Sequence, residues 1–165
     1  QQADAEYLPF RDDSFDLVYS WGVLHHTPDT RKGLSEAYRV LKPGAMLKAM
    51  VYHTNSWTAW MLWARYALMR ARPWVTPRRC VFRYLESPGT KAYAPAEVKR
   101  MVEERGFVDV VLATRLGPGD SLNTARSSRY QGLLYKLVWA AYPGWFIRLM
   151  GDRFGLYLLI TARKP

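Results

Sequence analysis

The sequence predicts an α/β protein with a parallel sheet, and three observations lead to this prediction. Residues 15–20 form a short run rich in β-branched and aromatic residues, residues 30–41 have the apolar spacing of a helix, and residues 45–53 form a second apolar run. Strand, helix and strand in this order within about forty residues match the length of a crossover unit that joins two parallel strands. With 165 residues, the chain is long enough for one hydrophobic core, so we expect one domain.

Each part of this unit has its own sequence signal. The run "FDLVYS" follows the turn-forming residues "RDDS", and its composition predicts a strand buried on both faces. Asp29 is placed to cap the following helix, because an aspartate side chain accepts hydrogen bonds from the first free amides of a helix. The sequence "KPGA" is expected to end that helix, and "AMLKAMVYH" is expected to be a second buried strand.

Residues 54–72 contain no glycine or proline. Their tryptophans recur at helical spacing and their arginines lie toward the end, where cations suit the helix dipole. This pattern predicts one amphipathic helix, which Pro73 and Pro77 are expected to end.

The rest of the chain is predicted to add a helix, two strands and an apolar stretch. These are a helix from Ala94 or Pro95 to Gly106, strands within residues 108–116 and 155–165, and an apolar helical stretch over residues 130–151 interrupted at Pro143 and Gly144. Neither apolar helical stretch reaches the roughly twenty uninterrupted apolar residues that cross a bilayer, so no transmembrane helix is predicted.

Charge is distributed unevenly along the chain, whose formal net charge is +10. Residues 1–29 carry six acidic residues and one arginine, whereas residues 53–85 carry no acidic residue, six arginines and four tryptophans. A basic and aromatic segment of this kind attracts phosphate groups, either of lipid headgroups or of nucleic acid.

The first residues and the single cysteine indicate in which compartment the protein is expected. The chain begins with Gln1 and has no basic segment followed by an apolar one, so no signal peptide is predicted, and we expect the domain to continue upstream of this sequence. Cys80 is the single cysteine and cannot form an internal disulfide, which favours a reducing, cytoplasmic setting.

Several segments together resemble a known family. The sequence "DAEYLPFRDDSFDLVYSWGVLHHTPD", followed by "EAYRVLKPGAML", resembles the middle of class I S-adenosylmethionine-dependent methyltransferases, in the broad methyltransferase type 11 group that includes quinone-biosynthesis C-methyltransferases. The segments "YAPAEVKRMVEERGFVDV" and "GLYLLITARKP" are similar to a later helix and strand and to the last strand of that family.

The resemblance implies a Rossmann-like, doubly wound sheet of seven strands with the last strand antiparallel. This chain would hold the strands from the fourth onward. Residues 1–165 would then be a partial methyltransferase domain without the first strands and their glycine-rich motif, and residues 54–90 would be a divergent, cap-like insertion within it.

The resemblance also implies that the chain binds S-adenosylmethionine through its first loop. Asp4 would accept a hydrogen bond from the adenine amino group, the Ala5 amide would donate to an adenine ring nitrogen, and Leu8 and Phe10 would be apolar walls. Glu6 lies in the same loop and is assigned to the same site. The alternatives are that Asp4 caps local amides in a turn and that Leu8 and Phe10 are ordinary core residues.

Ser20, Trp21 and Gly22 come at the end of the first strand. Ligands of open α/β sheets bind at the carboxyl ends of strands, so these residues are assigned to the cofactor site. Gly22 allows backbone to approach the cofactor closely. Trp21 must either cover the cofactor or pack beneath the loop, and the sequence leaves both possibilities open.

His25 and His26 are the candidate catalytic bases, with His26 preferred, because imidazole titrates near neutral pH. The alternative is that they orient the Asp29 cap or line the cofactor pocket. A metal site is not predicted, because the remaining histidine, His53, and the single cysteine are remote in sequence.

His53 and Trp57 are the candidate substrate contacts. His53 follows the second strand at a carboxyl end, and Trp57 opens the tryptophan- and arginine-rich segment. For His53 the alternative is an ordinary surface histidine in a loop.

The predicted reaction is in-line transfer of an activated methyl group to a hydrophobic or lipid-like small molecule, for which alignment and exclusion of water supply most of the acceleration. Residues 57–83, with residues 130–150, are expected to form an apolar lid and to contact anionic membrane. The alternative is that the tryptophans are core residues of the cap and the arginines form a solvated face. The competing interpretation is a non-catalytic, basic module on a degenerate methyltransferase fold that binds membrane or nucleic acid. Nucleic acid is the less favoured partner, because a purely electrostatic surface would not require the acidic first loop.

Overall fold

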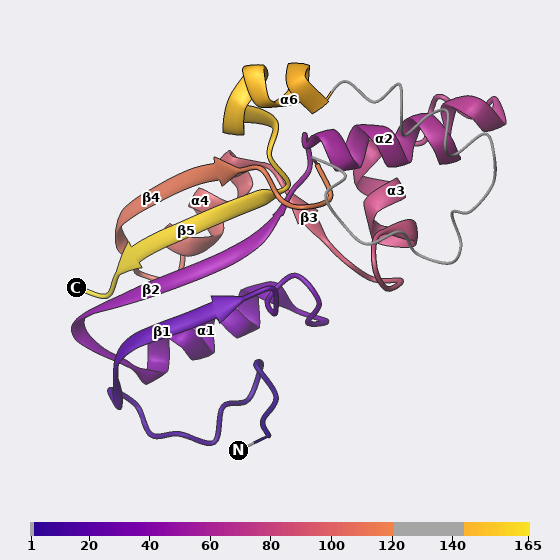
Figure 1. Cartoon of the computed structure of the whole chain (residues 1–165). Coiled ribbons are helices and arrows are strands. Elements are labelled where there is room, and N and C mark those ends of the chain that lie inside the picture. The colour runs from indigo at the N-terminus through magenta and orange to yellow at the C-terminus, as the bar shows by residue number, and fades with distance from the viewer. Residues whose placement is uncertain (1, 121–143) are drawn as a thin grey trace.

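A computed structural model of the chain describes residues 2–120 and 144–165, which form one α/β unit (Figure 1). In chain order its strands, helices and short 3-10 helices (η) are β1 (Phe15–Trp21), α1 (Thr30–Val40), β2 (Leu41–His53), α2 (Trp57–Tyr66), η1 (Leu68–Arg70), α3 (Pro77–Tyr84), β3 (Ala92–Tyr93), α4 (Pro95–Glu103), β4 (Val108–Arg115), α6 (Gly144–Met150), η3 (Gly151–Phe154) and β5 (Tyr157–Arg163).

The strands of the described residues form a mixed sheet with the order β1-β2-β5-β4, and the two-residue strand β3 pairs with the end of β2. β1 and β2 are parallel, as predicted from the strand-helix-strand order. β5 is antiparallel to both β2 and β4, as the resemblance implied for the last strand. The described part of the sheet has five strands, so the expected total of seven stays a prediction.

The connection from β1 to β2 follows the prediction at its start and differs at its end. Asp29 is the N-cap of α1, and its side chain accepts hydrogen bonds from the amides of Arg31 and Lys32. Helix α1 ends at Val40 and β2 begins at the next residue, so "KPGA" lies within the first part of the strand instead of forming a separate turn. Gly44 has a φ of 82°, which an L side chain rarely adopts, and this explains the glycine there.

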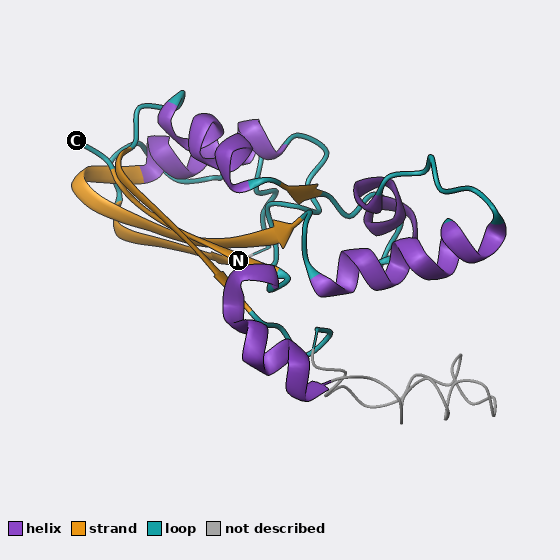
Figure 2. Ribbon diagram, turned by 90° about the horizontal axis from the view of Figure 1, so that it is seen from above, coloured by secondary structure: helices purple, strands orange, loops and turns teal. Residues whose placement is uncertain are grey.

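The main core lies between the sheet and two helices on the same face of it, α1 and α4 (Figure 2). The helices contribute aliphatic residues at helical spacing, and β2 and β5 contribute alternate residues. The largest side chains of this core that are fully buried are Leu34, Leu41, Leu47, Val51, Val98, Val102 and Leu158. This shared face explains the apolar spacing of both helices.

The other face of β1 is exposed, which corrects one prediction. Leu17, Tyr19 and Trp21 alternate along β1 and are all exposed, although β1 was expected to be buried on both faces. Met46 on the neighbouring strand β2 is exposed on this side too. Among the described residues no helix covers this part of the sheet, and a strand is buried on both faces only where both are covered.

The segment predicted as one helix over residues 54–72 is broken into several pieces. α2 ends at Tyr66 and is followed by η1, and Ala71 then takes a left-handed conformation with a φ of 54°. Pro77 does not end a helix but occupies the first turn of α3, with Thr76 as the N-cap. The α2 and α3 helices pack together, and the rings of Tyr66 and Tyr84 stack with centroids 3.9 Å apart.

Near the C-terminus, α6 and η3 lead into β5. Most of the apolar stretch predicted over residues 130–151 lies outside the described residues, and α6 is its described part. Of the helices described in residues 2–120 and 144–165, none has both the length and the apolar character required to cross a bilayer.

Candidate functional site

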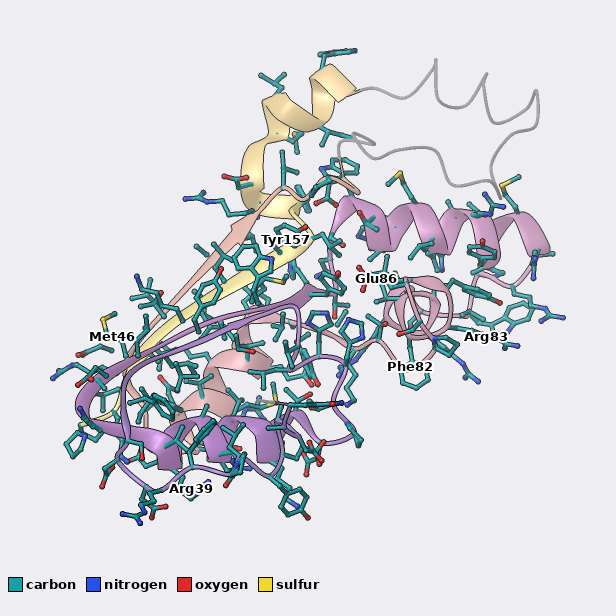
Figure 3. The ribbon with its side chains drawn as sticks, turned by 60° about the horizontal axis from the view of Figure 1, so that its bottom comes forward. Arg39, Met46, Phe82, Arg83, Glu86 and Tyr157 are labelled. Atoms are coloured by element: carbon teal, nitrogen blue, oxygen red, sulfur yellow. The ribbon has the colours of Figure 1, made fainter. Side chains whose placement is uncertain are left out.

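Several of the predicted site residues lie at the carboxyl ends of β1 and β2, whereas Phe10 packs against Phe15 at the amino end of β1. Three segments meet there: the N-terminal loop, the loop after β1 with the start of α1, and the segment after α3. Figure 3 shows Glu86, from the segment after α3, between the end of β2 and α3, and Tyr157 nearby at the start of β5. The site is therefore assembled from residues that are far apart in the sequence.

Asp4 and Ala5 lie against the start of α1. Asp4 is exposed, and its Oδ1 atom accepts a hydrogen bond of 2.9 Å from the Glu6 amide. This is the local turn that the sequence left open as the alternative role of Asp4. Among the described residues, its Oδ2 atom has no hydrogen-bond partner, so one carboxylate oxygen remains available to a ligand. The Ala5 carbonyl lies 3.7 Å from where a Cβ would stand on Gly33, so Ala5 is in close contact with α1.

Glu6 is buried and holds the N-terminal loop to the helix cap. Its Oε1 atom accepts a hydrogen bond of 2.6 Å from the Asp29 amide, and Asp29 in turn caps α1. A carboxylate used in this way positions the loop, so the assignment of Glu6 to the cofactor itself stays a prediction without support from these contacts.

Arg39 on α1 fixes the next part of the loop, and sequence analysis did not identify it. Its guanidinium group donates hydrogen bonds to the carboxylates of Glu36 and Asp12 and to the backbone carbonyls of Leu8 and Phe10, at 2.7 to 3.0 Å. Glu36 also accepts a hydrogen bond of 2.8 Å from the Leu8 amide. The hydrogen bond from Arg39 lowers the pKa of Glu36, against the opposing effect of burial.

The two apolar walls predicted for adenine differ in exposure. Leu8 is half-buried, whereas Phe10 is exposed and packs edge-on against Phe15, with ring centroids 5.0 Å apart. Leu8 therefore fits the assigned role better than Phe10 does.

Ser20, Trp21 and Gly22 stand at the carboxyl end of β1, as predicted. Trp21 is 48% exposed and lies on the open face of the sheet, stacked on Tyr19 and edge-on to Tyr157. Gly22 has a φ of 74°, and a Cβ there would meet only the end of the Met50 side chain, at 3.8 Å. Backbone conformation, and not crowding by the described residues, is thus the reason for glycine at this position.

His25 is fully buried in the loop after β1. Its ring lies over Tyr52, with centroids 4.1 Å apart, and beside His26, with centroids 4.3 Å apart. Burial and the neighbouring His26 lower the pKa of His25 to about 4. The His25 ring is therefore neutral at neutral pH.

His26 is half-exposed and contacts two side chains that are remote in sequence. Its Nδ1 atom lies 3.3 Å from Thr90 Oγ1, and its Nε2 atom lies 3.2 Å from Glu86 Oε2. Glu86 also accepts a hydrogen bond of 2.6 Å from the Tyr52 hydroxyl. Burial and Glu86 raise the pKa of Tyr52, which keeps its hydroxyl protonated.

These contacts bear on the predicted role of the histidines. Both ring nitrogens of His26 face a side chain, so neither is free to accept a proton from a substrate without a rearrangement. The side-chain contacts of His26 are with Glu86 and Thr90 and not with the Asp29 cap, so both the catalytic role and the alternative roles of the histidines stay predictions. Sequence analysis missed Glu86, Thr90 and Tyr52, because no local pattern connects them to the histidine pair.

His53, the last residue of β2, and Trp57 contact the segment before β5, and no contact between them and the histidine pair is described. His53 is only 5% exposed, so it is not a surface histidine, and its Nδ1 atom lies 3.2 Å from the Gly155 carbonyl. Burial lowers the pKa of His53. The Trp57 ring packs against Phe154, with centroids 5.6 Å apart. Both residues therefore contact the segment that leads into β5.

Asp120 is a buried carboxylate that joins the same region, and sequence analysis did not identify it. Its Oδ1 atom accepts hydrogen bonds from the amide and the hydroxyl of Thr58, and its Oδ2 atom accepts from the amides of Gly117 and Leu156. These bonds connect the start of α2 to the residues just after β4 and just before β5. They also satisfy a buried charge that would otherwise be costly.

Comparison with known proteins assigns the family. Residues 1–48 match the family described as "Methyltransferase domain". A demethylmenaquinone methyltransferase from Lactobacillus johnsonii is 31% identical over 124 residues, which are 72% of this chain and 50% of that protein. A ubiquinone/menaquinone biosynthesis C-methyltransferase from Bartonella tribocorum is 29% identical over 111 residues, which are 64% of this chain and 42% of that protein.

The chain belongs to the class I S-adenosylmethionine-dependent methyltransferases. It spans about half the length of the curated relatives that it matches.

Solved structures agree on the Rossmann-like methyltransferase fold. A possible histamine N-methyltransferase from Thermotoga maritima matches with a TM-score of 0.61 at 16% identity, over 99% of this chain and 62% of that one. A phosphoethanolamine N-methyltransferase from Haemonchus contortus matches with a TM-score of 0.59 at 18% identity, over 98% of this chain and 36% of that one. At these identities the similarity establishes the fold of this methyltransferase chain.

Proposed function

We propose that this chain provides part of an S-adenosylmethionine site and takes part in methyl transfer to a hydrophobic small molecule. The observation that carries the proposal is that the segment matching the methyltransferase family, residues 1–48, contains the loop around Asp4, the carboxyl end of β1 and the start of α1. The relatives matched over a longer part of the chain are named as quinone methyltransferases, which supports the same activity.

The residues at this edge fit the adenosine part of the cofactor. Asp4 is exposed and keeps one carboxylate oxygen for the adenine amino group, and the half-buried Ala5 follows it. Leu8, also half-buried, lies farther along α1, where Glu36 and Arg39 bind its backbone. Gly22 presents backbone without a side chain at the carboxyl end of β1. Arg39 and Glu6 would act as positioning residues, because they hold this loop against α1.

The cofactor supplies a methyl group that is already activated as a sulfonium. The protein is then required to hold the two reactants in line and to exclude water. Trp21 and Tyr157 form an aromatic surface next to the carboxyl end of β1 that suits an apolar acceptor. His25, His26, His53 and Trp57 remain candidates for contacts with that acceptor.

We further propose that residues 54–90 form a cap-like unit that contacts an anionic membrane. The end of α2, the segment after it and α3 line an open pocket of about 510 Å³ with arginines and aromatic residues: Tyr66, Arg70, Arg72, Trp74, Val75, Thr76, Arg79, Arg83 and Tyr84. In the same segment, Met69 and the lining residue Trp74 are each 75% exposed. Basic residues interleaved with exposed tryptophan and methionine suit the headgroup region of a bilayer.

A methyl-transfer assay tests the proposed activity. The chain, and any longer polypeptide that contains it, would be incubated with S-adenosylmethionine carrying a labelled methyl group and with demethylated naphthoquinone and benzoquinone acceptors. We expect label in the quinone fraction, lost in Asp4→Ala and retained in Asp16→Ala, whose carboxylate is exposed and pairs with Lys42. Absence of transfer from every polypeptide, with every acceptor, would overturn the proposed activity.

A further inference from the structure

Three potential metal ligands meet between the loop after β1 and the segment after α3. His25, His26 and Glu86 each offer one ligand atom, and these atoms all lie within 4.8 Å of one another. His26 Nε2 and Glu86 Oε2 are the closest pair, at 3.2 Å. Ligand atoms that share a zinc ion at bond lengths of about 2.0–2.2 Å in tetrahedral geometry stand roughly 3.3 Å apart, so this pair already has the required spacing.

The hydrogen bonds around His26 determine which ring nitrogen carries the proton. Thr90 has one hydroxyl proton, which it donates to the Ser87 carbonyl at 2.8 Å. Thr90 Oγ1 must therefore accept from His26 Nδ1, which lies 3.3 Å away. A neutral His26 then carries its lone pair on Nε2, the atom that faces Glu86.

The lone pair of His26 Nε2 and the carboxylate atom Glu86 Oε2 thus face each other at 3.2 Å. The Glu86 carboxylate is not protonated by its other neighbour, because the Tyr52 hydroxyl is the donor in their 2.6 Å contact. A nitrogen lone pair directed at a carboxylate oxygen is repulsive, unless a cation lies between or beside the two atoms. That cation is either a proton or a metal ion.

His25 favours the metal ion. Among the described residues, neither of its ring nitrogens has a hydrogen bond of good geometry, although the Met50 backbone is close to the ring, and the side chain is fully buried. Buried polar groups are almost always satisfied, so an unpartnered imidazole beside His26 and Glu86 requires an explanation. A proton shared between His26 and Glu86 leaves His25 with the Met50 backbone as its only polar neighbour of this kind among the described residues, whereas a metal ion gives it a ligand bond as well.

We propose that His25, His26 and Glu86 bind a divalent transition-metal ion, with zinc as the preferred ion. Two imidazoles and one carboxylate are a common protein ligand set for zinc with one coordination position left open. Thr90 and Tyr52 hold the other polar atoms of His26 and Glu86, as the outer partners of metal ligands usually do. The Glu86 side chain is 51% exposed, so a metal ion could reach this place from solvent.

The site needs only a small closure. The largest separation among the three ligand atoms, up to 4.8 Å, exceeds the spacing around a zinc ion. Glu86 is on the surface, just after α3, and can turn without disturbing the core. The metal would then add a bond between the loop after β1 and the segment after α3, which are remote in sequence and otherwise joined by hydrogen bonds.

The sequence prediction of no metal site is revised by this proposal. That prediction considered His53 and Cys80 as further ligands, but the third ligand is a glutamate about sixty residues away from the histidine pair. The inference is independent of the proposed methyl transfer, because a metal at this place is testable without cofactor or acceptor.

Zinc binding to the full chain tests the inference directly. Zinc would be titrated against a chromophoric chelator in competition with the tag-free protein, and cobalt(II) would serve as a spectroscopic substitute. We expect one zinc per chain and a cobalt spectrum with intense visible bands and without a thiolate charge-transfer band. Zinc affinity is expected to fall at least about tenfold in Glu86→Gln, which keeps the contact with Tyr52 but removes the charge.

Glu103→Gln is the matched control, since Glu103 is also a 51% exposed glutamate, at the end of α4. It should bind zinc as the unaltered chain does. His26→Gln should weaken binding as Glu86→Gln does. The inference is overturned if the chain binds no zinc, if Glu86→Gln binds as tightly as Glu103→Gln, or if the cobalt spectrum shows a thiolate ligand.

Discussion

At the scale of single residues, Arg39 connects the helix α1 to the loop that carries the proposed adenine contacts. One guanidinium group holds two carboxylates and two backbone carbonyls. Its planar set of donors makes this possible, and a lysine has no equivalent geometry. The position of Leu8, and with it the shape of the loop after Asp4, depends on this one side chain.

Arg39→Lys is predicted to lower the urea midpoint of unfolding, because a lysine cannot replace the hydrogen bonds that the guanidinium group makes to two carboxylates and two carbonyls. Urea unfolding followed by circular dichroism measures the change. Arg163→Lys is the control, since its pair with Asp109 is exposed and contributes little. Equal losses in the two variants would contradict the special role of Arg39.

Glu36 gives a prediction of pH dependence. The Arg39 contact lowers its pKa in the folded protein. A lowered carboxyl pKa stabilises the fold above the ordinary value of about 4.3, and this stabilisation is lost as the pH falls through the folded pKa. Glu36→Gln lacks this contribution, so the difference in unfolding free energy between the two proteins should be largest near neutral pH and should shrink below about pH 4. Unfolding curves measured over a pH series check this, and a difference that stays constant into acid would contradict it.

At the scale of elements, local signals predicted some boundaries and not others. Asp29 identified the start of α1, because an N-cap acts on amides two and three residues away. Pro77 was misinterpreted, since proline both ends a preceding helix and begins a following one, and only the contacts of α3 with α2 decide between these roles. The partners of His26 could not be predicted, because Glu86 and Thr90 reach it only through tertiary packing.

The cap-like unit formed by α2, η1 and α3 is predicted to bind anionic membranes. In a flotation assay the chain should float with vesicles containing phosphatidylglycerol and not with pure phosphatidylcholine, and high salt should weaken binding. The double variant Met69→Ser, Trp74→Ser should float several-fold less, because these exposed apolar residues are removed. Val111→Ser, which alters an exposed apolar residue of β4, should float as the unaltered chain does. Failure to float with acidic vesicles at low salt would contradict membrane contact.

At the scale of the whole molecule, the sheet has two unequal faces. α1 and α4 cover one face, while Leu17, Tyr19 and Trp21 on β1 are exposed on the other. Exposed apolar patches of this kind promote association. In the described residues β1 pairs only with β2, so its other edge also offers free backbone groups.

The chain is therefore predicted to self-associate as its concentration rises. Leu17→Thr with Tyr19→Thr keeps residues that favour strands and removes the apolar surface, so it should raise the monomer fraction in light-scattering measurements with little effect on the unfolding midpoint. An unchanged monomer fraction would show that this face does not drive association.

The fold was largely predictable from the sequence, whereas the site was predictable only in part. The order of β1, α1 and β2 and the antiparallel last strand followed from local patterns and from the family resemblance. Gly22 follows the end of β1 as the sequence predicted, while the assignment of Asp4 and Gly22 to the cofactor stays a prediction. The roles of Glu6, Arg39 and Glu86 depend on contacts between distant segments, which no local pattern contains.

The central claim is that the edge formed by Asp4, Ala5 and Gly22 receives the adenosine part of the cofactor. Calorimetric titration with S-adenosylhomocysteine, of this chain and of any longer polypeptide that contains it, tests this most directly. We predict one binding site whose affinity falls at least about tenfold in Asp4→Asn, because hydrogen bonds from the adenine amino group to a charged acceptor are the strong ones, while Asp16→Asn binds normally. Binding that is absent throughout, or that is equally tight in Asp4→Asn, would contradict the claim.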